Sequence, residues 1–375
     1  MDRPGLQAPG PGWRTGAGLV WMLLALAGCG GGGGAAGDTS TPLPPLRTLG
    51  PADLAVLVAE GDATSEAIAL AYQQARGIPA ANIIRVTGLP ANSDTISAAA
   101  FDAIKARLDT QLPAAVQATL VTWTRPSRVV GATCSMGLTS ALAFGYDARY
   151  CGALCKNTQA SPYYNSNSSQ PFADHGMRPS MMLGASTLAD AQALIQRGVA
   201  ADGSRTAAGS TAHAWLVRTD DAERNARAAD FQVLAAQSLP GLSLHYVDNA
   251  AGSGSNVVAN QGGVMVYLTG LAHVPQITTN TYLPGAVADH LTSWGGILPD
   301  ARGQMPATEW LAAGATASYG TVEEPCSFEQ KFPRATVLVA RYVRGETLIE
   351  AYWKSVQWPG QGLFLGEPLA QPWRR

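Results

Sequence analysis

The pattern that most constrains the fold is a repeated alternation of short runs rich in Val, Leu and Ile with longer stretches of helical period. Such short apolar runs are typical of strands that are buried on both faces of a sheet. The stretches between them are long enough to cross over from one parallel strand to the next. The chain is therefore predicted to form an α/β fold, with a mostly parallel sheet and crossover helices.

The expected elements follow in order along the chain. Ser65 is expected to cap the first helix and Gly77 to end it, whereas Ser97 is expected to cap the second helix. Strands are expected at residues 54–59, 82–86, 118–124, 181–183, 213–218, 242–247 and 264–268. Helices are expected at residues 65–76, 97–108, 188–196, 222–236 and 335–356, the last interrupted at Gly345. Residues 358–366 are expected to return as a turn and a short strand that closes the domain.

One unit is repeated in the sequence. Residues 54–86 and 214–247 both run strand, acidic turn, helix, glycine and strand, with Asp62 and Asp220 in matching turns. Residues 52–375 also exceed the length at which a single core usually stops growing. The domain is therefore predicted to consist either of two similar halves, at 52–175 and 176–375, or of one large sheet.

The N-terminus carries the features of an export signal. Arg3 and Arg14 precede an uncharged apolar run at residues 19–27, which is too short for a transmembrane helix of about 20 apolar residues. The run ends in Leu26-Ala27-Gly28-Cys29, which resembles the bacterial lipobox. This resemblance implies cleavage of a signal peptide at 1–28, diacylglycerol on the Cys29 thiol and an acyl chain such as palmitate on the new amino terminus. Two such chains suffice for stable membrane anchoring.

The segment behind Cys29 is Gly-rich and then Pro-rich, and it has no periodic apolar face to bury. Residues 29–51 are therefore predicted to form a tether that spans about 25 Å, and the α/β domain is expected at 52–375. Gly30 is not the acidic residue that retains lipoproteins at the inner membrane. The expected location is the cell envelope, on the outer membrane, facing the periplasm or the surface.

Charge and motifs exclude several functions. A formal net charge of −2 argues against a nucleic-acid partner, which requires a basic surface. The mature chain has no GxxxxGK[ST], HExxH, GxGxxG or GxSxG motif, so nucleotide hydrolysis and the commonest zinc peptidase and esterase mechanisms are not expected. No cofactor is predicted.

Besides the lipidated Cys29, four cysteines remain in the mature chain, an even number in a compartment that tolerates disulfides. Three pairings are open, and buried free thiols are the alternative. A zinc site is disfavoured, because no histidine stands at a ligand spacing from these cysteines. The disulfide candidates are Cys134, Cys151, Cys155 and Cys326.

Polar residues that follow the expected strands are candidates for a ligand site. In open parallel sheets ligands bind beyond the carboxyl ends of the strands. The alternative is ordinary helix capping, which acidic residues in such turns commonly provide. These candidates are Asp62, Thr124 to Arg128, Asp220, Asp221 and Gly270 to His273.

Two late segments, at 284–296 and 314–326, concentrate groups suited to catalysis. They hold an imidazole, hydroxyls, carboxylates and a glycine pair that could offer free amides to an oxyanion. His290 and Ser293 are three residues apart and would share one face if the segment were helical. The candidate catalytic residues are therefore Asp289, His290 and Ser293, and ordinary capping and packing is the alternative for each.

Several motifs, which together span nearly all of the mature chain, carry a family resemblance. They are Leu57-Val58, 65–72, 76–79, Ile96-Ser97, Phe101-Asp102, 289–296, 314–325 and 366–370. With these motifs the chain resembles an uncharacterised family of exported bacterial proteins that occur with exosortase and PEP-CTERM sorting, a membership that implies no established activity. More distantly, its alternating order and its late Gly-Ala-x-Ala strand are similar to the gingipain and caspase-like fold, which pairs a His after one strand with a Cys after the next. On this chain the His position is His273, but the second falls at residues 292–294, which contain no cysteine.

Two functions stay open on these grounds. The first is a hydrolase-like, peptidase-related domain, active through a hydroxyl such as that of Ser293, or degenerate. The second is a cell-envelope binding module for a glycan or peptide, without catalysis. Its support is the number of tryptophans, which favour sugar or chain contacts where they are exposed and otherwise pack in the core. They include Trp123, Trp294, Trp310, Trp353 and Trp358.

Overall fold

The computed structural model describes residues 47–152, 155–205 and 212–374. The predicted signal peptide, the lipidation site Cys29 and residues 29–46 of the predicted tether lie outside the described residues. Within the part that is described, no helix is both long and apolar enough to cross a membrane.

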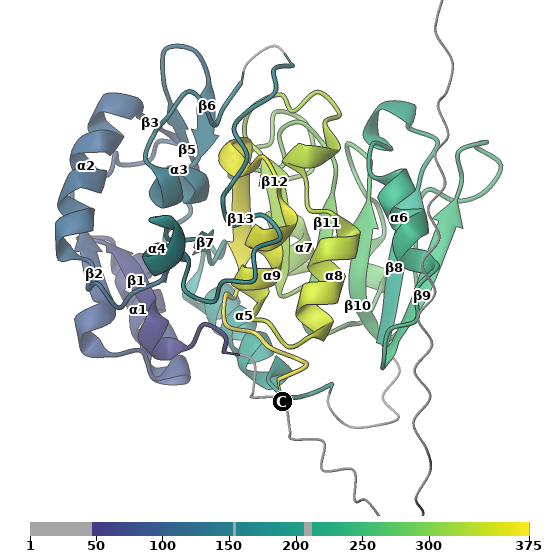
Figure 1. Ribbon diagram of the computed structural model, residues 1–375, viewed down its shortest axis with the longest axis horizontal. Coiled ribbons are helices and arrows are strands. Elements are labelled where there is room, and N and C mark those ends of the chain that lie inside the picture. The colour runs from purple at the N-terminus through teal and green to yellow at the C-terminus, as the bar shows by residue number, and fades with distance from the viewer. Residues whose placement is uncertain (1–46, 153–154, 206–211, 375) are drawn as a thin grey trace, which may run out of the picture. The chain divides into compact units, whose positions relative to one another are not determined.

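Among the described residues, ten strands form one sheet in the order β2-β1-β4-β7-β13-β12-β11-β10-β8-β9 (Figure 1). Strands β1, β2, β4 and β7 are mutually parallel, and so are β8 to β12. Strand β13 is antiparallel to β12 and lies between the two groups. The strands are β1 (Leu54–Ala59), β2 (Ile83–Val86), β4 (Ala118–Val121), β7 (Ser180–Met182), β8 (Ala212–Arg218), β9 (Leu242–Asp248), β10 (Val264–Thr269), β11 (Tyr282–His290), β12 (Ala317–Thr321) and β13 (Gly362–Gly366).

The helices connect these strands, and a small second sheet lies beside them. The small sheet has the order β3-β5-β6, formed by Thr95–Ser97, Arg128–Val130 and Ser135–Gly137. The helices are α1 (Ala63–Arg76), α2 (Ala98–Gln111), α3 (Leu138–Phe144), α4 (Pro171–His175), α5 (Leu188–Ala201), α6 (Ala228–Ala235), α7 (Thr308–Ala312), α8 (Ala335–Val343) and α9 (Leu348–Ser355). The predicted α/β class, with a mostly parallel sheet and crossover helices, is confirmed.

The start of α1 differs from the prediction. Asp62, not Ser65, is the N-cap, and its carboxylate accepts hydrogen bonds from the backbone N of Thr64 at 2.9 Å and of Ser65 at 3.1 Å. Ser65 is already inside the helix and is buried, where its hydroxyl accepts a hydrogen bond from the backbone N of Ala59. The prediction that Ser65 caps the helix is therefore wrong, whereas Gly77 ends it as expected with φ 65°.

The predicted helix at 222–236 is shorter than expected. A 3-10 turn at Ala222–Arg224 comes first, and α6 begins only at Ala228. The side chain of Asn225 accepts a hydrogen bond from the backbone N of Thr219 and donates one to its carbonyl, which ties the chain to the end of β8. The break expected at Gly345 is present and separates α8 from α9, with φ 97°.

The repeated unit occupies both edges of the same sheet. In one copy β1, α1 and β2 place β2 at one edge, and in the other β8, α6 and β9 place β9 at the opposite edge. In each copy the two strands are parallel neighbours. One continuous sheet therefore runs through both of the expected halves.

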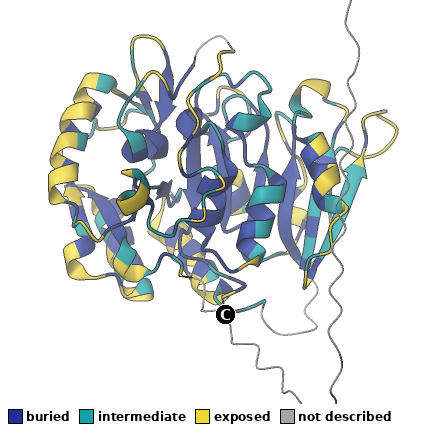
Figure 2. Cartoon of the chain, in the orientation of Figure 1, coloured by how far each residue is buried: buried dark blue, intermediate teal, exposed yellow. Residues whose placement is uncertain are grey.

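The last strand lies in the middle of the molecule. Every residue of β13 is buried, and Trp353 of α9 stacks on Phe364 with the ring centroids 4.3 Å apart. Figure 2 shows the central strands in dark blue, whereas the outer face of α2 is exposed. Residues 362–366 therefore complete the core of the sheet, rather than only closing it.

A buried ion pair fastens the end of β13 to the first helix. Glu367 is fully buried, and its carboxylate accepts hydrogen bonds from the Tyr72 hydroxyl at 2.6 Å and from the Arg76 guanidinium at 3.0 and 2.6 Å. Arg76 also binds Asp202, just after α5, at 2.6 Å. Three segments far apart in sequence are thus joined at one guanidinium.

Replacing one partner of this pair should destabilise the fold. Glu367→Gln keeps the size of the side chain but leaves the Arg76 charge without its buried partner, a loss that typically costs about 3–5 kcal/mol. The free energy of unfolding in urea measures this cost. Glu66→Gln, at the exposed pair of Glu66 and Arg85, is the control and should change stability by less than about 1 kcal/mol. Equal small effects in the two variants would contradict the assignment.

Candidate functional site

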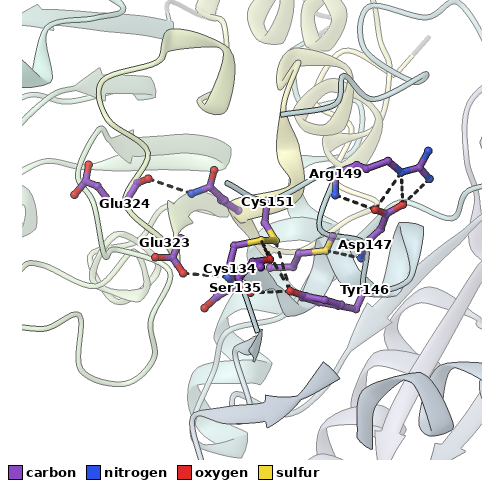
Figure 3. Close-up of a disulfide and its surroundings, with 11 residues drawn as sticks. Cys134, Ser135, Tyr146, Asp147, Arg149, Cys151, Glu323 and Glu324 are labelled. Carbon is purple, nitrogen blue, oxygen red and sulfur yellow. Dashed lines mark hydrogen bonds and ion pairs between the residues drawn. A yellow bond between two sulfur atoms is a disulfide. The ribbon is translucent and has the colours of Figure 1, made fainter. Parts of the chain in front are cut away.

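The loops that follow β4, β11 and β12 meet at one edge of the sheet. The backbone N of Leu298, after β11, donates a hydrogen bond to the Ser127 hydroxyl, after β4, at 3.1 Å. The carboxylate of Glu323, after β12, accepts one from the backbone N of Ser135 at 3.0 Å (Figure 3). This edge, at the carboxyl ends of the strands, is the usual place for a ligand in an open parallel sheet.

A cavity of about 490 Å³ opens at this edge, between the loops that follow β1, β2, β4 and β7. We call it the carboxyl-edge cleft. It is lined by residues 59–62, 64–65, 89–92, 122–125 and 185–186. Its volume is within the range of small-molecule sites.

The floor of the carboxyl-edge cleft is held by a closed set of hydrogen bonds. The Thr122 hydroxyl donates to the Leu57 carbonyl at 3.0 Å and lies 2.6 Å from the Ser65 hydroxyl. Ser65 in turn accepts from the backbone N of Ala59 at 2.9 Å. Both hydroxyls are therefore engaged within the protein, and they shape the cleft rather than offer a nucleophile.

The rim of the carboxyl-edge cleft carries charges of both signs. Glu60, Asp62 and Arg125 are exposed, as are Asn92 and Ser186. The carboxylates of this rim accept hydrogen bonds, its guanidinium donates them, and its amide can do both.

One side chain of the carboxyl-edge cleft has an unmet donor. Trp123 is only 5% exposed, and its indole N–H has no hydrogen-bond partner among the described residues. Buried polar groups are normally hydrogen-bonded, so an unpaired donor beside a cavity marks a place where a ligand or water can bind.

The structure brings some of the predicted strand-end residues into this cleft. Asp62, Thr124 and Arg125 line it together. Glu60 and Ser186, which the sequence analysis missed, line it as well. Both follow strands of the sheet, so the same rule on strand ends applied residue by residue could have found them.

The other strand-end candidates lie elsewhere. Asp221 caps the 3-10 turn after β8 and binds Arg224 at 2.7 Å. Asp220 accepts a hydrogen bond from the Asn256 side chain. His273 is exposed, and its Nε2 donates to the carbonyl of Gly303 at 2.8 Å. The capping alternative therefore accounts for Asp62 and Asp221.

His290 ends β11 and is not helical, so the face shared with Ser293 does not form. Its Nδ1 accepts a hydrogen bond from the Trp310 indole N–H at 2.9 Å, and its Nε2 donates to the carbonyl of Met305 at 3.1 Å. Burial lowers the pKa of His290 to about 3. The ring is neutral, and it has no free lone pair. It therefore cannot act as a general base, because a general base requires a free lone pair.

Asp289 is likewise a buried partner in a structural pair. Its carboxylate lies 2.6 Å from the Arg227 guanidinium, and both residues are almost fully buried. Burial raises the pKa of Asp289, and the Arg227 charge opposes that rise. Arg227 also donates to the Thr269 carbonyl at 2.7 Å, so the pair joins α6 to β10 and β11.

Ser293 stands in the loop after β11 and is half-buried. Its carbonyl accepts a hydrogen bond from the Thr321 hydroxyl at 3.0 Å. Within the described part of the chain, no hydrogen bond joins its side chain to His290 or His273. The structure therefore does not assemble the expected base and nucleophile.

All four cysteines in the described part of the chain form disulfides, which the sequence analysis had favoured over free thiols. Cys134 pairs with Cys151, and Cys155 with Cys326. The Tyr146 hydroxyl donates to the carbonyl of Cys134 at 2.9 Å beside the first bond (Figure 3). The second bond joins residues 171 positions apart and thereby restricts the unfolded chain. These residues are structural crosslinks.

Among the described residues, no group of three or more His, Cys, Asp or Glu side chains could hold a metal ion.

Comparisons with known proteins add little to this geometry. No family model matches the chain, and no curated protein matches its sequence. One solved structure, described as "Structure of Protease", is similar with a TM-score of 0.47 and 9% sequence identity, over 88% of this chain and 80% of that chain. A likeness of this strength carries no argument about activity.

The His290 ring should stay neutral far below the pH at which a free histidine is protonated. The unfolded state takes up a proton near pH 6.5, whereas the folded state does so only near pH 3. The stability that the neutral ring contributes is therefore full above pH 6.5 and is lost as the pH falls towards 3, by about 1.4 kcal/mol per pH unit. Nitrogen NMR of the ring at pH 5 checks the neutral Nε2–H form. Titration of the His290 ring near pH 6 would contradict it.

Proposed function

We propose that this protein is an exported lipoprotein, anchored through Cys29, whose α/β domain binds a cell-envelope glycan in the carboxyl-edge cleft. The observation that carries the proposal is the cleft itself: a cavity at the carboxyl ends of the strands with a polar rim of both charges. The ligand is bound and not transformed.

The chemistry of the rim suits a polyhydroxylated ligand. Most small-molecule pockets are lined mainly by apolar side chains, but this rim presents the carboxylates of Glu60 and Asp62, the guanidinium of Arg125 and the amide of Asn92. Sugar hydroxyls both donate to carboxylates and accept from guanidinium and amide groups. Trp123 adds an aromatic ring whose N–H is free to bind.

The geometry supports binding over the peptidase-related alternative. No histidine lines the carboxyl-edge cleft, and the buried His290 has both ring nitrogens engaged. The cysteines at 134, 151, 155 and 326 are held in disulfides, so none offers a thiolate. Acyl transfer requires a nucleophile with a base in reach of it. The carboxyl-edge cleft offers no such base, and its buried hydroxyls are engaged within the protein, so its geometry does not support acyl transfer.

The anchor rests on the sequence of the N-terminus. The short apolar run and Leu26-Ala27-Gly28-Cys29 support export and lipidation, and the resemblance to exported bacterial proteins agrees with them. Disulfides between all four described cysteines fit an oxidising compartment. Two acyl chains would hold the protein on the outer membrane while the Gly-rich and Pro-rich tether lets the domain turn.

Cys29→Ser should release the protein from the membrane. Without the thiol no diacylglycerol can be attached, so the anchor is lost. The measurement is the distribution of the protein between membrane and soluble fractions, together with metabolic labelling by a radioactive fatty acid. Ser40→Ala, within the tether, is the control and should stay in the membrane fraction. Retention and labelling of Cys29→Ser would contradict the lipidation.

Variants of the cleft rim should weaken glycan binding. Arg125→Ala and Glu60→Gln each remove a charged hydrogen-bonding group, a change of about 1.5–3 kcal/mol that weakens binding at least tenfold. Calorimetry with oligosaccharides released from peptidoglycan and lipopolysaccharide measures the affinity.

Arg85→Ala is the matched control, because Arg85 is exposed on β2 and binds Glu66 outside the cleft. It should bind like the wild type. If peptides bind to the cleft and none of the oligosaccharides does, the ligand is a peptide rather than a glycan. Equal affinity of wild type and both rim variants would refute the cleft as the site.

A further inference from the structure

A second cavity lies beside β4, at the end of the sheet that carries β2. It has a volume of about 240 Å³ and is lined by residues of α2, α3 and α4, by the segments that follow α2 and α4, and by one side chain of β4. Figure 1 shows these three helices grouped at this end of the molecule. We call it the helix cavity. It shares no lining residue with the carboxyl-edge cleft.

Arg178 places a buried positive charge in the wall of the helix cavity. The residue is 8% exposed, its Nε donates to the carbonyl of Val116 at 2.9 Å, and its guanidinium carbon lies 3.3 Å from the centroid of the Phe172 ring. Within the described chain, no carboxylate forms an ion pair with Arg178, and neither of its terminal nitrogens has a protein acceptor.

A guanidinium that faces a mainly apolar wall without a protein acceptor gains from an anionic partner. Burial lowers the pKa of Arg178, although a guanidinium remains charged. Its two terminal nitrogens present parallel N–H donors, the geometry that a carboxylate accepts with both oxygens.

Thr119 supplies a second unmet group in the same cavity. It is 3% exposed on β4, and its hydroxyl has no hydrogen-bond partner among the described residues. A buried hydroxyl without a partner is uncommon in a folded protein. Arg178 and Thr119 together make two independent donors, both lining the same cavity.

The remaining charges on the helix cavity cancel each other. The Lys105 ammonium binds both carboxylate oxygens of Asp109, at 2.7 and 2.5 Å. The net charge of the lining is therefore that of Arg178. The rest of the wall is apolar, formed mainly by Leu108, Leu112, Leu142, Ala143 and Phe172.

We propose that the helix cavity binds a small organic carboxylate, with its anionic end on Arg178 and Thr119 and its apolar body against the leucines. Inorganic phosphate or sulfate would satisfy the guanidinium but leave the apolar wall uncovered. The volume of about 240 Å³ is smaller than that of pockets for drug-sized ligands and accommodates a molecule of the size of benzoate. This site is separate from the proposed glycan cleft and does not depend on it.

The test uses the full-length protein in mild detergent, with calorimetric titration of sodium benzoate at constant ionic strength. Saturable binding with one benzoate per protein is expected. Benzyl alcohol, which has the ring without the charge, and inorganic phosphate, which has the charge without the ring, should each bind at least about tenfold more weakly.

Two variants locate the site. Arg178→Met removes the charge and should weaken benzoate binding at least about tenfold, and Thr119→Val, which keeps the shape, should weaken it about threefold. Arg125→Met, in the carboxyl-edge cleft, is the matched arginine control and should bind benzoate like the wild type.

Circular dichroism shows whether each variant is folded. If Arg178→Met does not fold, Thr119→Val decides alone, and wild-type affinity in that variant rejects the site. Absence of saturable binding to the wild type, or phosphate binding as tight as that of benzoate, also overturns the proposal. Loss of glycan binding in Arg125→Met with benzoate binding intact keeps the two sites distinct.

Discussion

The buried contact of Glu367 with Arg76 and Tyr72 is the constraint on which the rest of the fold depends. Strand β13 is the last strand in sequence, yet it lies between the parallel group that contains β1 and the parallel group that contains β12. Its end must therefore be attached to segments made much earlier. Three charge-assisted hydrogen bonds to one buried carboxylate offset the cost of removing it from water and join the first crossover helix to the last strand.

With β13 between the two strand groups, contacts between the loops of both groups restrain the carboxyl edge of the sheet. The contact of Leu298 with Ser127 and that of Glu323 with Ser135 join loops of the two strand groups. The disulfide between Cys155 and Cys326 joins them again, near the same edge. These contacts restrain the chain just after residues 122–125, which line the carboxyl-edge cleft, and this favours a preformed binding site over one that closes on its ligand.

The features of the fold that were predicted correctly from the sequence are those that local sequence signals determine. The units at both edges, the end of α1 at Gly77, the cap of α2 at Ser97 and the break at Gly345 were all expected. The segments of β11 and β12 were interpreted mainly as a cluster of chemical groups, and a late strand was expected there only from the caspase-like resemblance, because their Gly and Ala residues carry a weak strand signal. The partners of His290 and Asp289 are Trp310 and Arg227, and no local pattern indicates that they meet.

The difference between a structural and a functional polar residue is whether its hydrogen-bonding capacity is met. His290 and Asp289 have the chemistry of a catalytic pair, but both ring nitrogens of His290 are hydrogen-bonded within the protein, and the charge of Asp289 is paired with Arg227. Thr119 and Trp123 are less suggestive in sequence, yet each lines a cavity with a buried polar group that no described residue pairs. Arg178 lines the helix cavity as well, and only its Nε donates to a described acceptor. Because leaving such donors unpaired costs free energy, the cavities they line are where this protein has most to gain from a ligand.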